Sequence, residues 1–223
     1  MRALSVLFCG LNWNRGQEAL SIKAIVFDYG QVISLPQDPK AIDALAQKAG
    51  VERGKFEPVF LHLRKDYDRG TVSAREYIGN VLSHFDIKMD EKGIDEMIAM
   101  DLDSWKQINP ETVALMEELK ERGYTLGILS NMPNEFLCWA RSNAYVFSLP
   151  QKSLFSCEVN LLKPGEAIYR RLLSLFELEG EEIVFFDDSE ENAEGARKLG
   201  IKAFLWTGAE KARSDLLSVG VRL

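Results

Sequence analysis

Continuous apolar runs recur along the chain and alternate with helix-like patterns. The first run, Ala24–Phe27, stops abruptly at Asp28, and Gly30 follows two residues later. Short runs that are apolar at every position are typical of strands buried on both faces of a sheet. We predict four such strands, over residues 24–27, 124–131, 183–187 and 201–206.

The segments between these strands carry helix signals. One begins with Asn109 as N-cap and Pro110 in the first turn, and it ends at Gly123. A second follows Asp188 and stops at Gly200. Strands that alternate with helices indicate a parallel sheet covered by helices on both faces, so we predict an α/β fold.

Between residues 35 and 109 the pattern changes, and only helical spacing of apolar residues occurs. Ser73 with Glu76 forms a capping box at the start of one of these helices. We therefore predict an inserted helical domain of three to four helices over residues 35–109. The α/β core then consists of two stretches, residues 21–34 and 110–223.

Residues 1–20 stand apart from this organisation. A single Arg and a short apolar run outline a secretory signal peptide, but no small-residue cleavage site follows. The run is also shorter than the ~20 residues that span a bilayer. We interpret residues 1–20 as an N-terminal extension that lies upstream of the true start, with the first domain element opening near Leu20.

Composition narrows the classes of function. With 223 residues and 46% hydrophobic content, the chain is long enough for one domain with a substantial insertion. The net charge is −7 and no basic tract occurs, which argues against a nucleic-acid surface, and no segment indicates a membrane partner. The three cysteines, Cys9, Cys138 and Cys157, are unpaired in spacing, so we expect reduced thiols and a cytoplasmic protein.

Polar residues gather where the predicted strands end. Asp28, Ser130 and the Asp187–Asp188 pair each follow an apolar run. In an open parallel sheet the ligand crevice lies outside the carboxyl ends of the strands, so these side chains should converge. Each residue alone would be an ordinary turn former or helix cap. Three converging carboxylates repel one another unless a cation holds them together, and Mg²⁺ suits such a site.

Four segments together resemble the haloacid dehalogenase-like hydrolases. IVFDYGQVI (25–33), GILSN (127–131), LLKPGEAIY (161–169) and VFFDDSEEN (184–192) stand in the order and at the spacing of that family's four motifs. The resemblance extends from Ser21 to the C-terminus. It implies a Rossmann-like core, an all-helical cap domain inserted between the first two motifs, and Mg²⁺-dependent phosphoryl transfer to an aspartate from a small phosphorylated metabolite.

The resemblance also implies roles for individual residues. Asp28 matches the nucleophile and is a metal ligand, and Lys163 matches the cation that offsets repulsion between the nucleophile and an anionic substrate. Ser130 and the backbone of Asn131 match the phosphate-binding motif. The remaining metal ligands are the Gly30 carbonyl and Asp188, with Asp187 as a nearer alternative. Asn192 stands where many relatives have a further acid.

Gly30 departs from the pattern of most phosphatases in this family, which carry a second Asp at that place as general acid and base. Related sugar-phosphate phosphatases also have Asp-x-Gly there, so the departure does not exclude activity. Without an acid, substrates with good leaving groups should react best, unless a residue of the inserted helices supplies the proton. We also interpret Gly30 as permitting a turn that other residues would strain.

Two other functions remain open. A 2-haloacid dehalogenase would attack carbon without a metal, but that branch has a tyrosine two residues after the nucleophile, whereas Tyr29 is one residue after Asp28. A non-catalytic protein that binds phosphate or a partner is supported only by Gly30. Loss of one proton-transfer group typically costs about 10²- to 10⁴-fold, which weakens a reaction without abolishing it.

The inserted helices should select the substrate and act as a lid, with a hinge near Pro36 and Pro39. Within residues 62–70 the side chains that could face the core are Arg64, Lys65, Tyr67 and Arg69. We expect the only histidines, His62 and His84, to pack at the core or its boundary. The sequence gives no indication of oligomeric state or of the particular substrate.

Overall fold

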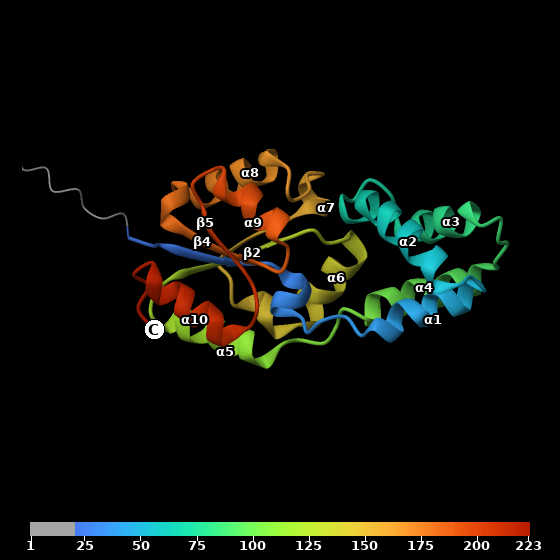
Figure 1. The fold of residues 1–223 in the computed structure, drawn as a ribbon, viewed down its shortest axis with the longest axis horizontal. Coiled ribbons are helices and arrows are strands. Elements are labelled where there is room, and N and C mark those ends of the chain that lie inside the picture. Colours follow the sequence, from blue (N-terminus) through green and yellow to red (C-terminus); the bar gives the residue numbers. More distant parts are fainter. Residues whose placement is uncertain (1–20) are drawn as a thin grey trace, which may run out of the picture.

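The computed structural model describes residues 21–223. The N-terminal extension expected over residues 1–20, the start site proposed near Leu20 and Cys9 lie outside the described residues. Figure 1 shows two parts, an α/β core that contains the sheet and a group of helices beside it. None of the helices within residues 21–223 has the length and apolar content needed to cross a bilayer.

The core contains one parallel sheet of five strands in the order β3-β2-β1-β4-β5. The strands are β1 (Ala24–Phe27), β2 (Thr125–Ser130), β3 (Lys152–Phe155), β4 (Ile183–Asp187) and β5 (Lys202–Leu205). The predicted parallel α/β fold is confirmed, and all four predicted strands are present. Phe27 pairs in register with both Ile128 and Phe186, so β1, β2 and β4 end at the same edge of the sheet.

Strand β3 was not predicted because its sequence lacks a continuous apolar run. Lys152 and Ser153 are half-buried, and only Leu154 and Phe155 are buried. The strand lies at the edge of the sheet, where it pairs with β2 alone. A four-residue edge strand with two polar positions has no period-2 or continuous apolar pattern to detect.

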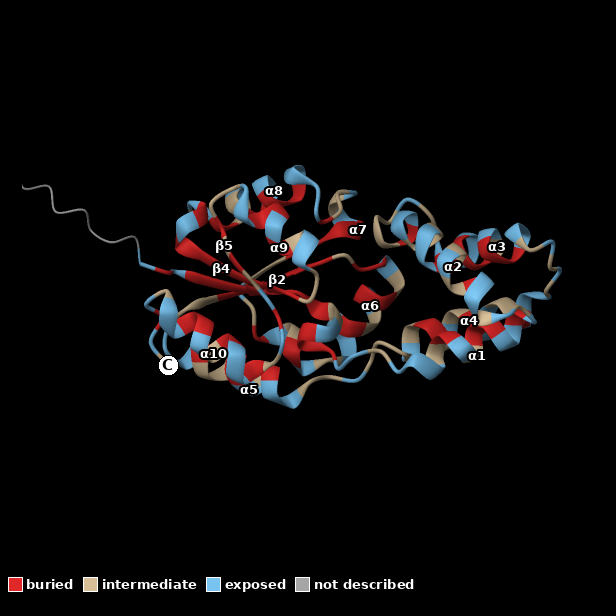
Figure 2. Ribbon diagram, viewed as in Figure 1, coloured by how far each residue is buried: buried red, intermediate tan, exposed pale blue. Residues whose placement is uncertain are grey.

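Helices cover both faces of the sheet. In the core these are α5 (Pro110–Glu121), α6 (Asn134–Asn143), α7 (Ser156–Val159), α8 (Glu166–Phe176), α9 (Glu190–Arg197) and α10 (Ala209–Ser218). Alternate residues of β1 point into two hydrophobic clusters: Ile25 packs with α5, α6 and α10, and Val26 packs with α8 and α9. Figure 2 shows the sheet buried between helices whose outer faces are exposed. As predicted, Asn109 caps α5, and its side chain accepts a hydrogen bond from the Glu111 N–H.

Four helices, which we call the cap, follow the first strand. They are α1 (Pro39–Ala49), α2 (Arg53–Asp68), α3 (Ala74–His84) and α4 (Glu91–Asp103). Their buried side chains, including Leu45, Phe56 and Met97, form a hydrophobic cluster separate from the two clusters on the sheet. The predicted Ser73–Glu76 capping box is present at the start of α3.

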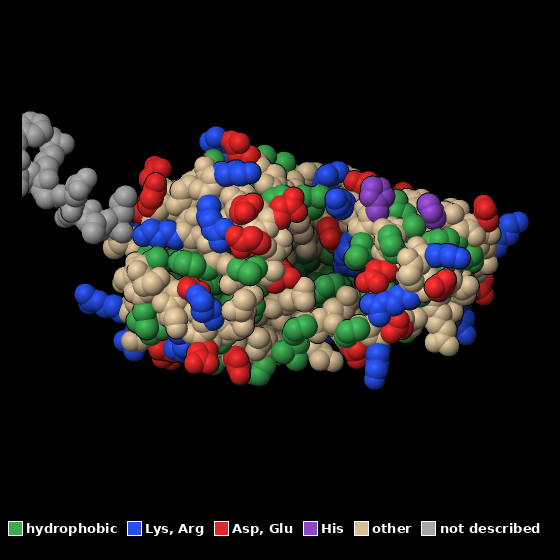
Figure 3. All heavy atoms as spheres, viewed as in Figure 1, with side chains coloured by type: hydrophobic (Ala, Val, Ile, Leu, Met, Phe, Trp, Pro, Cys, Tyr) green, Lys and Arg blue, Asp and Glu red, His purple; other side chains and the backbone are tan. Residues whose placement is uncertain are grey.

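The two histidines do not pack as predicted. His62 on α2 and His84 on α3 are both exposed, and Figure 3 shows them on the surface of the cap. Both lie beside apolar residues in the sequence, but a helix turns neighbouring positions to different sides. Phe60 and Leu82, two residues earlier in each case, occupy the buried faces of α2 and α3.

Two chain segments connect the cap to the core, and they run side by side. Ser34 and Ile108 form an isolated antiparallel bridge. The Leu35 N–H donates to the Gln107 carbonyl at 2.8 Å, and the Asn109 N–H donates to the Ile33 carbonyl at 2.8 Å. The cap therefore leaves and re-enters the core at one place.

A second contact joins the cap to the core at the C-terminal end of α2. Gly70 has φ of +77°, and a Cβ there would lie 2.7 Å from the Cys157 carbonyl oxygen of α7. The Asn160 side chain donates to the Arg69 carbonyl at 2.9 Å. Glu135 of α6 accepts from the Ala74 N–H at 2.8 Å. Only glycine allows the backbones to approach this closely, so Gly70 positions α2 against the core.

Candidate active site

A cavity of about 250 Å³ lies between the edge of the sheet and the cap. Figure 3 shows the surface hollowed at this place. The core contributes Asp28, Tyr29, Gly30, Gln31, Ser130, Asn131, Met132, Pro133, Phe136 and Asp188, and the cap and its return linker contribute Leu61, Arg64, Asp68 and Trp105. The cavity thus joins the carboxyl ends of the strands, where ligands bind in open parallel sheets, to side chains of the cap.

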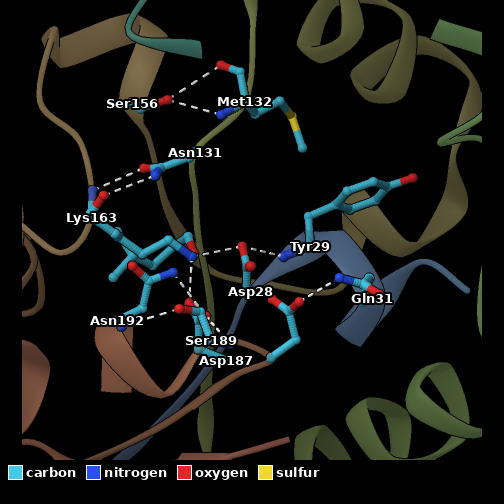
Figure 4. Close-up of polar contacts among 12 residues, drawn as sticks. Asp28, Tyr29, Gln31, Asn131, Met132, Ser156, Lys163, Asp187, Ser189 and Asn192 are labelled. Carbon is cyan, nitrogen blue, oxygen red and sulfur yellow. Dashed lines mark hydrogen bonds and ion pairs between the residues drawn. The ribbon is translucent and has the colours of Figure 1, made fainter. Parts of the chain in front are cut away.

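Asp28 lies directly after β1, at the buried end of the central strand. Its N–H donates to the Phe186 carbonyl of β4 at 2.8 Å, which continues the sheet pairing by one residue. The carboxylate Oδ1 accepts from the Tyr29 N–H at 2.7 Å and from Lys163 Nζ at 2.8 Å. Both contacts from the described residues fall on Oδ1, as Figure 4 shows, so Oδ2 is left for a ligand.

The surroundings of Asp28 disfavour its charged form. Burial raises the pKa of this carboxyl to about 7, and Asp187 and Asp188 add to the shift, while Lys163 opposes it. An anion that is poorly solvated and incompletely neutralised has much to gain from an additional cation nearby. The electrostatics of Asp28 therefore match the environment of a reactive carboxylate that works with a bound positive charge.

Lys163 is a buried cation whose three donor positions are all occupied. Its Nζ donates to Asp187 Oδ2 at 2.6 Å and to the Leu129 carbonyl at 3.0 Å, in addition to Asp28. Burial by itself lowers the pKa of an ammonium group, but Asp187 and Asp28 outweigh it and raise the pKa of Lys163. Lys163 therefore stays charged and fixes the spacing of the first and fourth strand ends.

The two acids at the end of β4 have different surroundings. Asp187 is fully buried, and its Oδ1 accepts from the Ser189 N–H and from Asn192 Nδ2, both at 2.9 Å. With Oδ2 bound to Lys163, both oxygens of Asp187 already have partners. Asp188 is half-buried at the cavity, and its Oδ2 accepts from Gln31 Nε2 at 2.5 Å. Asp188 is therefore the more available ligand, and Asp187 orients Lys163 and Asn192.

Ser130 and Asn131 bring the end of β2 to the cavity. Ser130 is the last residue of the strand and is buried. The Asn131 side chain pairs with the backbone of Lys163: Nδ2 donates to its carbonyl at 3.1 Å, and Oδ1 accepts from its N–H at 2.9 Å. Because the side-chain amide is already used, Asn131 holds the Lys163 loop, and the part of Asn131 left for a ligand is its backbone.

The interpretation of Gly30 as a conformational necessity is wrong. Its φ of −61° and ψ of 126° are accessible to any residue, and a Cβ would lie 3.6 Å from Trp105 Cζ3, an ordinary contact. The left-handed residue of this turn is the next one, Gln31, with φ of 58°. Backbone strain therefore does not explain why residue 30 is a glycine. The explanation must lie in the cavity, where a side chain at this position would occupy space or add a reactive group.

Several cavity residues were not singled out in the sequence. Gln31 stands within the first of the four segments but had no role assigned to it. Asp68 and Trp105 lack any local motif, and they reach the cavity because the cap lies over the sheet edge. Of the cap residues that were expected to face the core, Arg64 lines the cavity, whereas Lys65 is exposed and Tyr67 belongs to the hydrophobic cluster of the cap. A helical pattern alone does not show which side of α2 meets the core.

The donor set at the strand ends fits a divalent metal ion. Asp28, Asp187 and Asp188 each offer a carboxylate oxygen, and these oxygens lie within 4.8 Å of one another. Three carboxylates face one ammonium group, so the site carries excess negative charge. Burial, followed by the charge of Asp187, raises the pKa of Asp188 as well. Clustered carboxylate oxygens with excess negative charge are the environment that Mg²⁺ prefers.

The fold and the site together define an α/β protein with a candidate active site at the carboxyl edge of a parallel sheet, under an inserted group of helices. Residues 22–200 match the family model of haloacid dehalogenase-like hydrolases, and the chain belongs to this family. The resemblance seen in the four sequence motifs is thereby confirmed.

Two curated relatives share part of their length with the chain. Phosphatase MT3486 of Mycobacterium tuberculosis is 29% identical over 145 residues, which are 62% of this chain and 66% of the relative. Bifunctional epoxide hydrolase 2 of Sus scrofa is 25% identical over 225 residues, which are 92% of this chain and 40% of the relative. The match thus spans less than two thirds of each relative.

Solved structures share the fold over most of the chain. A HAD family enzyme from Bacteroides thetaiotaomicron has a TM-score of 0.72 at 23% identity, covering 84% of this chain and 95% of that one. The complex of that enzyme with magnesium and inorganic phosphate has a TM-score of 0.70 at 22% identity, and the match covers 84% of this chain and 96% of that one. The L-2-haloacid dehalogenase of Xanthobacter autotrophicus, with chloropropionic acid covalently bound, has a TM-score of 0.64 at 18% identity. That match covers 91% of this chain and 85% of the dehalogenase. At these identities the likeness concerns the fold.

Proposed function

We propose that the protein is a Mg²⁺-dependent phosphatase that hydrolyses a small, sugar phosphate-like metabolite through an aspartyl-phosphate at Asp28. One observation carries the proposal: Asp28, Asp187 and Asp188 cluster around the buried ammonium group of Lys163, at the floor of a cavity of metabolite size. The phosphatase activity named for the mycobacterial relative, and the magnesium and phosphate bound to the Bacteroides enzyme, agree with it.

The proposal assigns the core and the cap different tasks. Residues 21–34 and 110–223 hold the reacting groups, and residues 35–109 cover the cavity and exclude water during transfer. The two adjacent linkers at Ser34 and Ile108 are the place where such a lid would bend. The leaving group of the substrate lies toward the cap, because Leu61 and Trp105 form the wall opposite the strand ends.

The chain's own groups explain how the transfer proceeds. Asp28 Oδ2 attacks phosphorus, while Oδ1 stays fixed by the Tyr29 N–H and Lys163. Lys163 reduces the repulsion between the carboxylate and the anionic substrate. The Ser130 hydroxyl and the Asn131 N–H donate hydrogen bonds to the phosphoryl oxygens. Mg²⁺, held by Asp28, Asp188 and the Gly30 carbonyl, supplies further charge neutralisation when bound. Asp187 keeps Lys163 in place.

The test compares two substrates. With p-nitrophenyl phosphate and Mg²⁺ we expect steady release of orthophosphate, and with 2-chloropropionate no release of chloride. Chloride release without a metal would replace the proposal by a dehalogenase. No turnover of either substrate would identify a non-catalytic binding protein. A panel of sugar phosphates then defines the substrate.

Asp188→Asn should weaken the response to Mg²⁺ more than it affects the fold. Asp188 is half-buried and contacts Gln31, so its loss removes little packing, but it removes one of the available charged ligands. We expect the Mg²⁺ concentration for half-maximal activity to rise by about 10- to 100-fold, the range seen when groups around a metal are changed. Glu191→Gln, an exposed acid on α9, is the control and should leave the titration unchanged. Identical Mg²⁺ titrations in both variants would contradict this assignment.

A further inference from the structure

Asp68 is an acid of the cap that shares the cavity with Asp28. It is the last residue of α2, and its side chain lines the cavity together with Trp105 and Gly30. Its buried Oδ1 makes no hydrogen bond to residues 21–223 and has only an ion-pair contact with Arg64 Nε at 3.3 Å. Trp105 Nε1 is buried and likewise has no hydrogen-bond partner in this part of the chain. Two buried polar atoms without a hydrogen bond at the wall of one cavity are available to a ligand.

The backbone of Asp68 is fixed to the catalytic edge of the sheet. Its carbonyl accepts a hydrogen bond from the Ser156 hydroxyl, and the same hydroxyl oxygen accepts from the Met132 N–H at 2.8 Å. Met132 follows the phosphate-binding residues Ser130 and Asn131 directly. The end of α2 is therefore tied to the loop after β2, although α2 belongs to the cap. The close approach of Gly70 to Cys157 supports the same position.

The charges around Asp68 leave it as the acid that retains a proton. Arg64 donates to Asp101 Oδ1 at 2.8 Å, whereas its contact with Asp68 Oδ1 is an ion pair at 3.3 Å. One buried cation thus faces two carboxylates and favours the one that it hydrogen-bonds. Burial raises the pKa of Asp68 to about 7, opposed by Arg64 and assisted by Asp101.

The other titratable side chains near Asp68 do not compete for the proton. Burial raises the pKa of Tyr67 on α2 and of Tyr77 on α3, and it raises the pKa of Cys157 on α7 to about 11. All three are therefore neutral around pH 7. The acid chemistry of this wall of the cavity rests with Asp68.

The geometry points to Asp68 as the proton donor to the leaving group, the role for which Gly30 has no side chain; this inference rests on the proposed phosphatase function. As the bond between Asp28 Oδ2 and phosphorus forms, the bond between phosphorus and the substrate oxygen breaks, and that oxygen takes the proton of Asp68. Asp68 is then a carboxylate beside Arg64. In the second half-reaction it takes a proton from the water that attacks the aspartyl-phosphate, and both groups return to their first state.

The experiment measures the first turnover with two phosphate esters and Mg²⁺. Release of p-nitrophenolate needs no proton donor, because this leaving group is stable as an anion, whereas release of a simple alcohol needs one. For Asp68→Asn we expect alcohol release from an alkyl phosphate to fall about 10²-fold or more, and p-nitrophenolate release to change little. In the wild type we expect the rate of alcohol release from the alkyl phosphate to fall above neutral pH, and in Asp68→Asn we expect this fall to be absent. Asp66→Asn, an exposed acid two residues earlier on α2, is the control and should match the wild type.

Equal loss on both esters in a variant with wild-type thermal unfolding would overturn the inference, and so would no loss on either. If Asp68→Asn does not fold, Asp68→Glu provides the test. The pH at which the rate of alcohol release falls should differ from that of the wild type, because a different carboxyl group then supplies the proton. The same pH in both proteins would overturn the inference. These outcomes differ from failure of the proposed function, in which the wild type itself would release no phosphate from p-nitrophenyl phosphate.

Discussion

Asp28→Asn is expected to abolish phosphoryl transfer, with a loss on the order of 10⁴-fold or more in first-turnover p-nitrophenolate release, as for other covalent nucleophiles. The amide has the shape of the carboxylate but is a very weak nucleophile. Acid quenching of the wild type during turnover should trap a phosphoenzyme, and the variant should give none. Activity close to wild type in the variant would show that another group attacks.

The same substitution should leave the fold intact, which separates a chemical from a structural effect. Burial raises the pKa of Asp28 to about 7, so the folded state holds its proton more tightly than the unfolded chain does. As pH rises from the ordinary range of an aspartate through 7, ionised Asp28 therefore costs stability. Asparagine carries no charge at any pH. We expect the unfolding midpoint of Asp28→Asn at pH 8 to equal or exceed that of the wild type.

Lys163→Met should lower both the activity and the free energy of unfolding. Loss of the ammonium group leaves Asp28 and Asp187 buried without their shared cation. Removing one partner of a buried ion pair typically lowers the free energy of unfolding by about 3–5 kcal/mol. Activity should fall about 10²- to 10³-fold or more, because the substrate anion then meets an unshielded carboxylate. Urea unfolding and first-turnover rates measure the two losses.

The pH dependence and a control make this prediction specific. Lys163 lowers the pKa of Asp28, so without Lys163 this carboxyl takes up a proton more readily and the loss of stability should be smaller at pH 5 than at pH 8. Lys152→Met is the control: Lys152 is half-buried on β3, and its Nζ donates to the backbone carbonyls of Leu175 and Phe176. We expect it to cost about 1 kcal/mol, as for ordinary hydrogen bonds, and to leave activity unchanged. A loss in Lys163→Met no larger than in this control, or equal at both pH values, would contradict the paired-charge explanation.

The sequence predicts the core side of the site because local patterns and one topological rule suffice. Continuous apolar runs identify β1, β2 and β4, and parallel strands necessarily end at one edge, so Asp28, Ser130 and Asp188 had to converge. The family motifs then distinguish Lys163 from an ordinary surface lysine. Its three acceptors could not be derived in advance, since they come from three different strand ends.

The cap side could not be predicted in the same way. Asp68 and Trp105 reach the cavity because α2 and the return linker pack over the sheet edge, and no periodicity encodes that arrangement. Arg64 was a candidate only as one of several charged residues. The histidines show the reverse error, since apolar neighbours in the sequence do not place His62 on the buried face of its helix.

The adjacency of the two linkers at Ser34 and Ile108 has a consequence for how this enzyme can diversify. The core holds both ends of the insertion together. The entropic cost of closing an inserted segment grows only slowly with its length, so a longer insert adds little to that cost. Inserts of other sizes can therefore occupy this position without disturbing the order of the strands. Asp68 and Trp105 both belong to the chain between Ser34 and Ile108, so an exchanged insert would replace the proposed proton donor and the proposed wall for the leaving group. The proposed nucleophile Asp28 and its partner Lys163 would remain in the core.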